Sequence, residues 1–322
     1  MVSIKDVAKH AGVAISTVSK VLNHYPNISE STREKVVAAV EELNFVPNSV
    51  AAALSSKNAG RVALMIDLNV TAQAIDEIAM RYISGAITKA MELNLDVITL
   101  FVFMFQDKTA EELIRYLQSQ SITGIIIYGA AEDDCMLQEL ISSEKFKCVV
   151  IDDNHVSDNI SSITIDHKKA QYEVAKVLIE ETKAKKVLYI LGDENSYVTK
   201  TRLEGMEELI REKGIELLIK NGEFSETKSR EIVIQYGEDV DAIVCASDLM
   251  AIGAKSAIKQ MQMERPICGF DGISLMRYVG QGIYTIDQDF SEISGIAMEE
   301  VQRLLSGETG KMIEAGYSLV KN

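Results

Sequence analysis

The sequence predicts two unlike parts, a small all-α helix-turn-helix headpiece and an α/β body of two Rossmann-like lobes. Three observations support this fold class. Charge is divided unevenly along the chain, three short amphipathic helices follow one another near its start, and strand-length apolar runs alternate with helical patterns after residue 60. The 322 residues suffice for two compact domains, or for one large α/β body with a smaller unit appended.

The charge asymmetry separates the head from the body. Residues 1–60 hold six basic and five acidic side chains and carry +1, whereas the remaining residues hold 27 and 43 and carry −16. An acidic body would repel a polyanion such as DNA, and a near-neutral head would not. We therefore expect any nucleic-acid contact to come from the first 60 residues.

Apolar residues at steps of three and four predict three short helices in the head. The first covers 4–11 and stops at Gly12, the second covers 15–22, and the third runs from Ser29, as N-cap, toward Pro47. Two helices joined by a short turn and braced by a third predict a helix-turn-helix, whose second helix enters the DNA major groove. Similar three-helix modules also serve as protein-interaction domains, so periodicity alone leaves both readings open.

Eight apolar runs of strand length predict the sheets of the body. The first four runs are 62–66, 97–101, 125–128 and 149–151, and the second four are 187–191, 215–220, 242–245 and 267–270. Helical patterns between the runs favour parallel sheets with helices on both faces. Two such lobes would form a cleft at the carboxyl ends of their strands, where a small molecule can bind.

The chain carries no enzyme motif that we can recognise. The glycine loops GxGxxG and GxxxxGK[ST] and the nucleophile motif GxSxG are missing, and the four histidines are isolated from ligand patterns. We therefore expect no enzyme activity, no cofactor and no metal site, with His155 and His167 as surface or packed residues. We expect buried thiols at all four cysteines, Cys135, Cys148, Cys245 and Cys268.

A cytoplasmic location is expected, because the chain shows neither a secretory core near its start nor a membrane-length apolar run. The longest apolar runs fall short of the roughly 18 residues that a membrane helix needs.

Five ordered segments of the head carry a specific pattern. They are IKDVA at 4–8, AGV at 11–13, STVSKVLN at 16–23, ISESTR at 28–33 and NFVPN at 44–48. Together they resemble the headpiece of the LacI/GalR (lactose-repressor) family of bacterial transcription regulators. The resemblance implies that Ile15, Ser16 and Lys20 read bases while Thr17 and Ser19 hold phosphates. The full set of implied DNA contacts is Ser3, Ile15, Ser16, Thr17, Ser19, Lys20, Asn23, Ser29 and Leu54.

The head departs from the family pattern at two positions. Ala14 stands where the family usually has Ser, so the usual hydroxyl cap of the second helix is missing. Lys20 stands where Arg is common, and its point charge cannot make the two-pronged contact to guanine. The operator sequence therefore does not follow from the resemblance.

Residues 48–60 match the hinge helix and linker of the family. In the family this segment folds beside its dimer mate in the minor groove, where a Leu enters the central base step, and Leu54 matches that Leu. Ala52 replaces a usual Arg, which removes one contact of the family pattern. A plain linker helix is the alternative.

Segments at the strand ends of the body also resemble the family, in its periplasmic-binding-protein-like effector core. They include IDD at 151–153, RLEG at 202–205, GFD at 269–271 and TIDQDF at 285–290. The resemblance implies six effector contacts, Asp152, Arg202, Phe224, Ser247, Asp271 and Gln288. Carboxylates and a guanidinium can grip vicinal hydroxyls, and a ring can stack on a sugar face, although each residue alone also has a structural role available to it.

The effector itself is left open, because Asn69–Ile75 replaces the Asn-Pro-Phe-like stretch that relatives usually carry after the first strand. A sugar or sugar derivative is the first expectation, and a nucleobase or nucleoside acting as corepressor is the alternative. A sugar-processing Rossmann enzyme is a distant third. A free solute-binding protein shares the two lobes, but the first 60 residues argue against it.

The resemblance implies a homodimeric, allosteric repressor that binds a pseudo-palindromic operator and does not associate with membranes. Without leucine heptads after the last strand pattern, we expect a dimer and no tetramer. The expected boundaries are 1–47 for the headpiece, 48–60 for the hinge and 61–322 for the core. Within the core we expect a first lobe at about 61–155 plus 289–311 and a second at about 156–288 plus 312–322.

Overall fold

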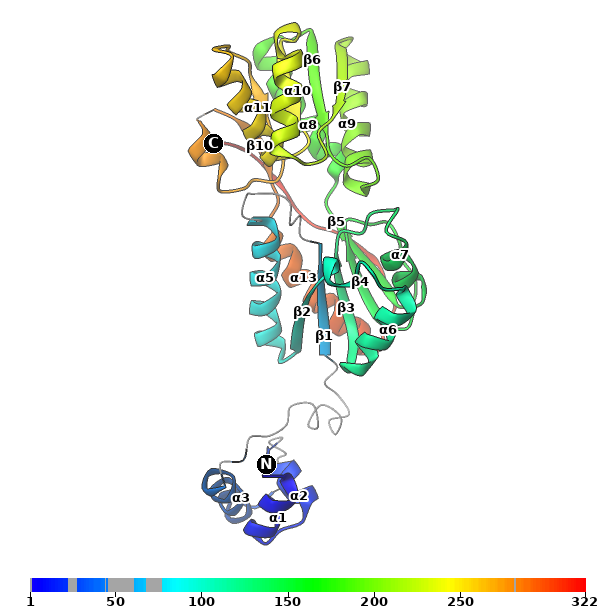
Figure 1. The fold of residues 1–322 in the computed structure, drawn as a ribbon, viewed down its shortest axis with the longest axis vertical. Helices are drawn as coiled ribbons and strands as arrows, with labels where there is room; N and C mark the ends of the chain where they lie inside the picture. The colour runs from blue at the N-terminus through cyan, green and yellow to red at the C-terminus, as the bar shows by residue number, and fades with distance from the viewer. Residues whose placement is uncertain (1, 23–27, 44, 46–60, 68–76, 281) are drawn as a thin grey trace. The chain divides into compact units, whose positions relative to one another are not determined.

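The computed structural model describes residues 2–22, 28–43, 45, 61–67, 77–280 and 282–322. The chain divides into two compact units, Met1–Gly60 and Arg61–Asn322 (Figure 1). Three features of the sequence analysis lie outside the described residues, namely Asn23, the hinge at 48–60, which contains Leu54, and the loop Asn69–Ile75. Among the described residues, no helix is long and apolar enough to cross a membrane.

The first unit contains α1 (Ile4–Ala11), α2 (Ile15–Leu22) and α3 (Glu30–Glu42). Val7, Val18 and Val36, one from each helix, are fully buried against one another and form the centre of a small core. The apolar spacing that predicts the three helices thus also predicts the face on which they pack. α3 ends five residues before the expected Pro47, with Leu43 as its C-cap.

Local sequence sets the ends of these helices. Ser3 and Asp6 form a capping box, in which the Asp6 carboxylate accepts the Ser3 N–H at 2.9 Å and the Ser3 hydroxyl at 2.7 Å. Gly12 ends α1 at φ 66°, a left-handed conformation that favours glycine. Ser29 holds the N-cap position of α3 with extended backbone, but its hydroxyl bonds to Thr32 Oγ1 at 2.8 Å and not to a backbone N–H.

The first lobe of the body is an all-parallel sheet in the order β11-β5-β4-β3-β1-β2. Its strands are β1 (Arg61–Ile66), β2 (Asp96–Phe101), β3 (Ile122–Tyr128), β4 (Lys147–Ile151), β5 (Ile160–Thr164) and β11 (Met312–Glu314). Its helices are α5 (Glu77–Leu93), η1 (Val102–Phe105), α6 (Ala110–Ser119), α7 (Cys135–Ser142) and α13 (Phe290–Leu305). Alternate residues of β1 pack against α5 with α13 on one face and against α6 with α7 on the other.

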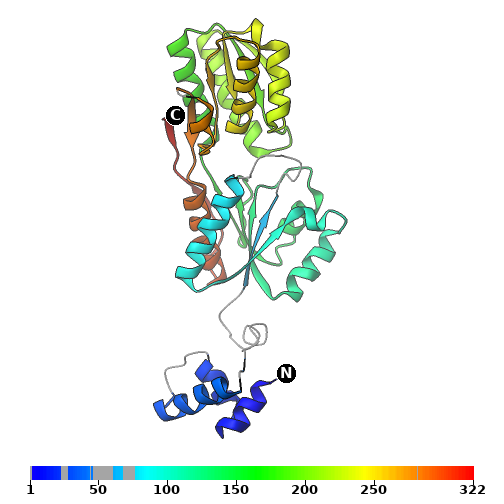
Figure 2. The ribbon, with the colours of Figure 1, turned by 60° about the vertical axis from the view of Figure 1, so that its left-hand side comes forward.

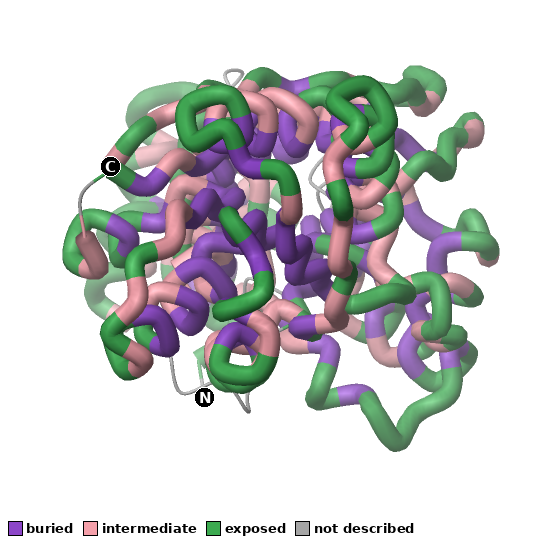
Figure 3. The backbone as a smooth tube through the Cα atoms, turned by 90° about the horizontal axis from the view of Figure 1, so that it is seen from above, coloured by how far each residue is buried: buried purple, intermediate pink, exposed green. Residues whose placement is uncertain are grey.

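The second lobe has the strand order β12-β10-β9-β8-β6-β7, in which only β12 is antiparallel to its neighbour. Its strands are β6 (Lys186–Leu191), β7 (Glu216–Asn221), β8 (Ala242–Cys245), β9 (Ile267–Cys268), β10 (Tyr284–Asp287) and β12 (Ser318–Lys321). Its helices are α8 (His167–Thr182), α9 (Tyr197–Lys213), α10 (Glu226–Tyr236), η2 (Gly237–Asp239), α11 (Asp248–Gln260) and α12 (Met276–Val279). In Figure 3 the buried backbone of the body, in purple, runs between exposed outer helices.

The expected lobe boundaries are wrong for two strands, β5 and β11. β5 and β11 pair in parallel with each other, and β5 pairs with β4, so both belong to the first lobe rather than the second. The chain therefore crosses between lobes three times, from β5 to α8, from β10 to α13 and from β11 to β12 (Figure 2). The carboxyl ends of the parallel strands of both sheets face each other, since residues that follow β4 in the first sheet and β8 and β9 in the second line one cavity.

The expectation of four buried thiols is wrong for Cys135. Cys148, Cys245 and Cys268 are buried, whereas Cys135 is exposed. The physical reason is its place as the first residue of α7, a helix that packs through Leu137, Leu140 and Ile141.

Candidate functional site

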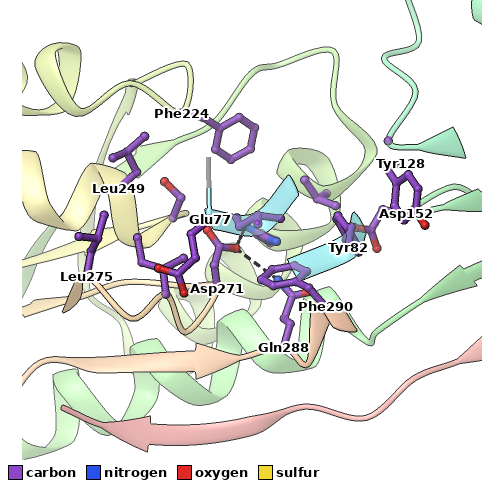
Figure 4. A pocket seen from close by; sticks show the side chains of 16 residues that line it. Glu77, Tyr82, Tyr128, Asp152, Phe224, Leu249, Asp271, Leu275, Gln288 and Phe290 are labelled. Atoms are coloured by element: carbon purple, nitrogen blue, oxygen red, sulfur yellow. Dashed lines mark hydrogen bonds and ion pairs between the residues drawn. The ribbon is translucent and has the colours of Figure 1, made fainter. Parts of the chain in front are cut away.

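A cavity of about 360 Å³ lies between the two lobes of the body (Figure 4). All six side chains expected to contact an effector line it, namely Asp152, Arg202, Phe224, Ser247, Asp271 and Gln288. Arg202 comes from α9, and the other five come from the segments that follow β4, β7, β8, β9 and β10. The structure therefore brings together residues that are up to 136 positions apart in the sequence.

Four of the residues around this cavity form a chain of buried contacts that we call the charged network, Asp152, His167, Arg202 and Asp271. Arg202 is 3% exposed, and its Nε–H donates to His167 Nδ1 at 3.3 Å. Its Nη1 donates to the Ala246 carbonyl at 2.5 Å and lies 3.5 Å from Asp271 Oδ1. The guanidinium also lies 3.7 Å from the centre of the Phe270 ring.

His167 links the two lobes within this network. It is fully buried at the start of α8, and its Nε2 lies 2.8 Å from Oδ1 of Asp152, the residue that follows β4. Because Nδ1 accepts from Arg202, Nε2 must carry the proton of a neutral imidazole and donate it to Asp152. Burial lowers the pKa of His167 below its ordinary value, against the opposing influence of Asp152.

The two carboxylates of the network have opposite pKa shifts. Burial alone would raise the pKa of Asp152, but His167 and Arg202 outweigh burial and hold that pKa below its usual value. Burial raises the pKa of Asp271 to about 6 even though Arg202 lies beside it. Gln288 Nε2 donates to Asp271 Oδ1 at 3.2 Å, so this side chain too is held by the protein.

Three residues at the cavity have left-handed backbone that non-glycine residues rarely adopt. The φ angles are 57° at Asp152, 53° at Phe224 and 115° at Asp271. Such conformations cost of order 1–3 kcal/mol each and concentrate at ligand sites, where the strained backbone aims a side chain. The Phe224 ring lies directly over Gly192, where even a Cβ would come within 2.1 Å of it.

Several lining residues were not expected from the sequence. Tyr82, Tyr128 and Phe290 form what we call the aromatic cluster, with ring centres 4.5 Å apart for the two tyrosines and 5.1 Å for Tyr82 and Phe290. Glu77 begins α5 and accepts the Ser274 N–H at 2.8 Å, which bridges the lobes. Phe290 lies inside the matched TIDQDF segment, so its sequence signal was available, whereas Tyr128 is hidden at the end of an apolar strand.

The head presents the residues expected to contact DNA on one side of α2. Val18 and Val21 point into the core, while Ile15, Ser16 and Lys20 are exposed and Thr17 and Ser19 are half-buried. Ser3 and Ser29 are exposed at the starts of α1 and α3. Hydroxyls and one exposed ammonium on α2, and the exposed helix N-termini of α1 and α3, are groups suited to phosphate oxygens and base edges.

Comparison with known proteins decides the family. Residues 3–48 match the model of the lacI family of bacterial regulatory proteins, and residues 80–269 match that of periplasmic binding proteins and the sugar-binding domain of the LacI family. The chain belongs to the LacI family. It is a DNA-binding transcription regulator with a helix-turn-helix head and a two-lobed α/β body.

Among its LacI-family relatives is the transcriptional regulator MalR of Clostridium butyricum, which is 28% identical in an alignment that covers 94% of this chain and 93% of MalR. The ribose operon repressor of Halalkalibacterium halodurans is 26% identical, with coverage of 92% and 88%.

Two solved structures share the whole fold. The Lac repressor dimer bound to operator and an anti-inducer has a TM-score of 0.83 and 22% identity, covering 99% of this chain and 98% of its own. The complex of the regulator CelR with cellobiose has a TM-score of 0.72 and 21% identity, covering 100% and 99%.

Proposed function

We propose that this LacI-family regulator is a homodimeric repressor whose operator binding is controlled by a sugar held in the cavity between its lobes. The observation that carries the proposal is the convergence of six side chains, chosen from the sequence, on one cavity. Strained backbone at Asp152, Phe224 and Asp271 supports the same site. The relatives that are a ribose operon repressor and a regulator bound to cellobiose support the sugar class and the negative sign of control.

In this proposal the head binds one operator half-site. Ile15, Ser16 and Lys20 read bases, Thr17 and Ser19 contact phosphates, and Leu54 enters the central base step. The exposure of Ile15, Ser16 and Lys20 on α2 supports the first of these roles. Replacing Lys20 with Ala should then relax the preference at one base pair of each half-site without abolishing binding.

A homodimer would cover an apolar face of the first lobe. Met80, Ile87 and Met91 lie seven and four residues apart on α5 and are exposed, Met91 by 76%. Tyr278 on α12 of the second lobe is 86% exposed. Exposed apolar groups of this size favour a protein contact over solvent, and a second copy of the chain is the occupant that the Lac repressor dimer suggests.

The decisive experiment combines two titrations. An operator is first selected from a random duplex library, and its binding by the full-length protein is then measured with and without sugars, sugar phosphates and nucleosides. Release of the operator by a sugar, together with a rise in Tm, supports the proposal. A tighter complex would make the ligand a corepressor, and a response to nucleosides alone would replace the sugar class.

A further inference from the structure

The charge around the cavity restricts which sugars it can accept, an inference that rests on the sugar effector proposed above. Three carboxylates line the cavity, those of Glu77, Asp152 and Asp271. Among the lining residues that the structure describes, Arg202 is the one cation. A bound phosphate would be desolvated beside a surplus of negative charge, and like charges in such a place cost several kcal/mol.

The charge of Arg202 is already balanced by a buried carboxylate of the protein. Its Nε–H donates to His167 and its Nη1 donates to the Ala246 carbonyl, and the Asp271 carboxylate lies 3.5 Å from Nη1. Phe270 covers one face of the guanidinium. Turning Arg202 toward a ligand phosphate would leave the buried Asp271 carboxylate without its ion pair, which is strongly unfavourable.

Helix N-termini, the other usual phosphate sites, have an acidic residue in or beside the first turn at three places around the cavity. α5 begins at Glu77, α11 begins at the buried Asp248, and α13 is capped by Asp289, which accepts two N–H groups of the first turn at 3.1 Å. α9, whose Val198 lines the cavity, has no acidic residue in its first turn, but Lys200 there pairs with Glu132 of the first lobe.

Neighbouring segments add no cation to the lining. Residues 68–76, which precede Glu77 and lie outside the described residues, read LNVTAQAID and contain no Lys, Arg or His. Arg81, one turn further along α5, faces Asp287 and Asp289 at 3.7 Å each and lies over the Phe290 ring. Its charge is therefore also balanced by the protein.

We propose that the cavity selects an uncharged polyhydroxylated effector and rejects the phosphate ester of the same sugar, with Asp271 as the residue that determines this specificity. Carboxylates that accept hydroxyl hydrogen bonds hold the polar edge of the sugar. Phe224 and Phe290 cover its apolar faces. By keeping Arg202 occupied, Asp271 excludes the anion.

The test uses matched pairs of ligands on the full-length protein. Ribose, glucose, maltose and cellobiose are each compared with a phosphate ester of the same sugar by thermal shift and calorimetry. We expect the uncharged member of at least one pair to bind, and its ester to bind about a hundredfold more weakly or worse, as several kcal/mol of charge repulsion implies. An ester that binds as well as its parent overturns this inference but leaves the sugar effector standing. Silence in every pair overturns the proposed sugar effector and this inference with it.

Asp271→Asn provides an independent test with inorganic phosphate as the probe. This change removes one negative charge and releases Arg202, so phosphate should raise the Tm of the variant while leaving the wild type unchanged. Asp158→Asn, the same change at an exposed loop residue of the first lobe, is the matched control and should behave as the wild type. If Asp271→Asn does not fold, Glu77→Gln lowers the charge of the lining by the same amount and should narrow the gap between sugar and ester. A phosphate response in the wild type, no phosphate response in a folded Asp271→Asn variant, or an unchanged gap between sugar and ester in Glu77→Gln contradicts the role assigned to charge.

Discussion

The charged network and the aromatic cluster bound the same cavity but are built in different ways. Each member of the network depends on the next, since Asp152 is held by His167, His167 by Arg202, and Arg202 by Asp271. The rings of the cluster touch through broad apolar surfaces, with Tyr128 anchored by Ser294 Oγ at 2.5 Å. Removing one charge therefore orphans its neighbours, whereas removing one ring leaves packing that can adjust.

Arg202→Ala should show the largest effect, because it leaves Asp271 buried without a cation and His167 without its donor. We expect a loss of about 3–5 kcal/mol in the free energy of unfolding, measured by urea denaturation. Arg115→Ala, at an exposed arginine with a distant i,i+4 partner, is the control and should change stability by less than about 0.5 kcal/mol. Equal urea midpoints for the two variants would mean that the charged network is exposed to water in solution and not buried.

Tyr82→Leu should cost less, about 1 kcal/mol, because it removes two ring contacts worth about 0.5–1.5 kcal/mol and retains an apolar side chain. Its effector affinity should fall as well, since Tyr82 lines the cavity. Tyr116→Leu removes a comparable ring contact, with Phe105 on the far side of the first sheet, and should cost similar stability at unchanged effector affinity. A parallel loss of affinity in both variants would place the effector elsewhere.

The pH dependence of the stability should reveal the lowered pKa of His167. Its pKa is lowered in the folded protein, so below its ordinary value of 6.5 the unfolded chain binds more protons and stability falls as pH decreases. Asp271 has the opposite effect on stability. Its pKa is about 6 in the folded protein and 3.8 ordinarily, so between these values the folded state binds more protons and becomes more stable as pH falls.

His167→Gln isolates the histidine contribution. The stability difference between wild type and variant should shrink by up to about 1 kcal/mol between pH 7 and pH 5.5, followed by urea midpoints. His155→Gln changes an exposed histidine and should leave the pH profile as it is in the wild type. A profile for His167→Gln that runs parallel to the wild type would contradict a neutral buried imidazole.

Lys200→Ala should have the smallest effect. Lys200 and Glu132 form an ion pair of 2.5 Å between the lobes, but their side chains are 50% and 58% exposed. Such an exposed pair contributes about 0.2–1 kcal/mol to stability and is screened by salt. The loss should vanish at high ionic strength, while the loss for Arg202→Ala should persist. Solvent exposure, rather than charge or distance, would then account for the difference between the two sites.

The sequence predicts the charged part of the cavity better than its aromatic part. Asp152 and Asp271 follow β4 and β9 and Arg202 lies in the second turn of α9, and all three belong to segments whose resemblance to the family implied a role in effector binding. Tyr82 and Tyr128 continue the apolar pattern of a helix and a strand, so nothing in the sequence separates them from core residues. His167 looked isolated because its partners are distant in the chain, 15 positions away for Asp152 and 35 for Arg202.

The strands of the body were predicted where they are apolar and missed where they are not. β5 reads Ile-Ser-Ser-Ile-Thr, and its two serines are fully buried. Ser161 donates to the buried Glu300 of α13 at 2.5 Å, so a polar strand sits in the core by hydrogen bonding. Hydrophobic periodicity cannot report such a strand, and the expected lobe boundary therefore fell on the wrong side of it.

The three crossings between lobes also fix the order in which the body can be completed during synthesis. The second sheet gains five of its six strands between Lys186 and Asp287, from one continuous stretch of chain. The first sheet waits for α13, which covers one of its faces, and for its edge strand β11, made more than 140 residues after β5. The lobe that the ribosome begins first is therefore the one that must stay unfinished until β11 (Met312–Glu314) has been made, after every strand of the second sheet except β12.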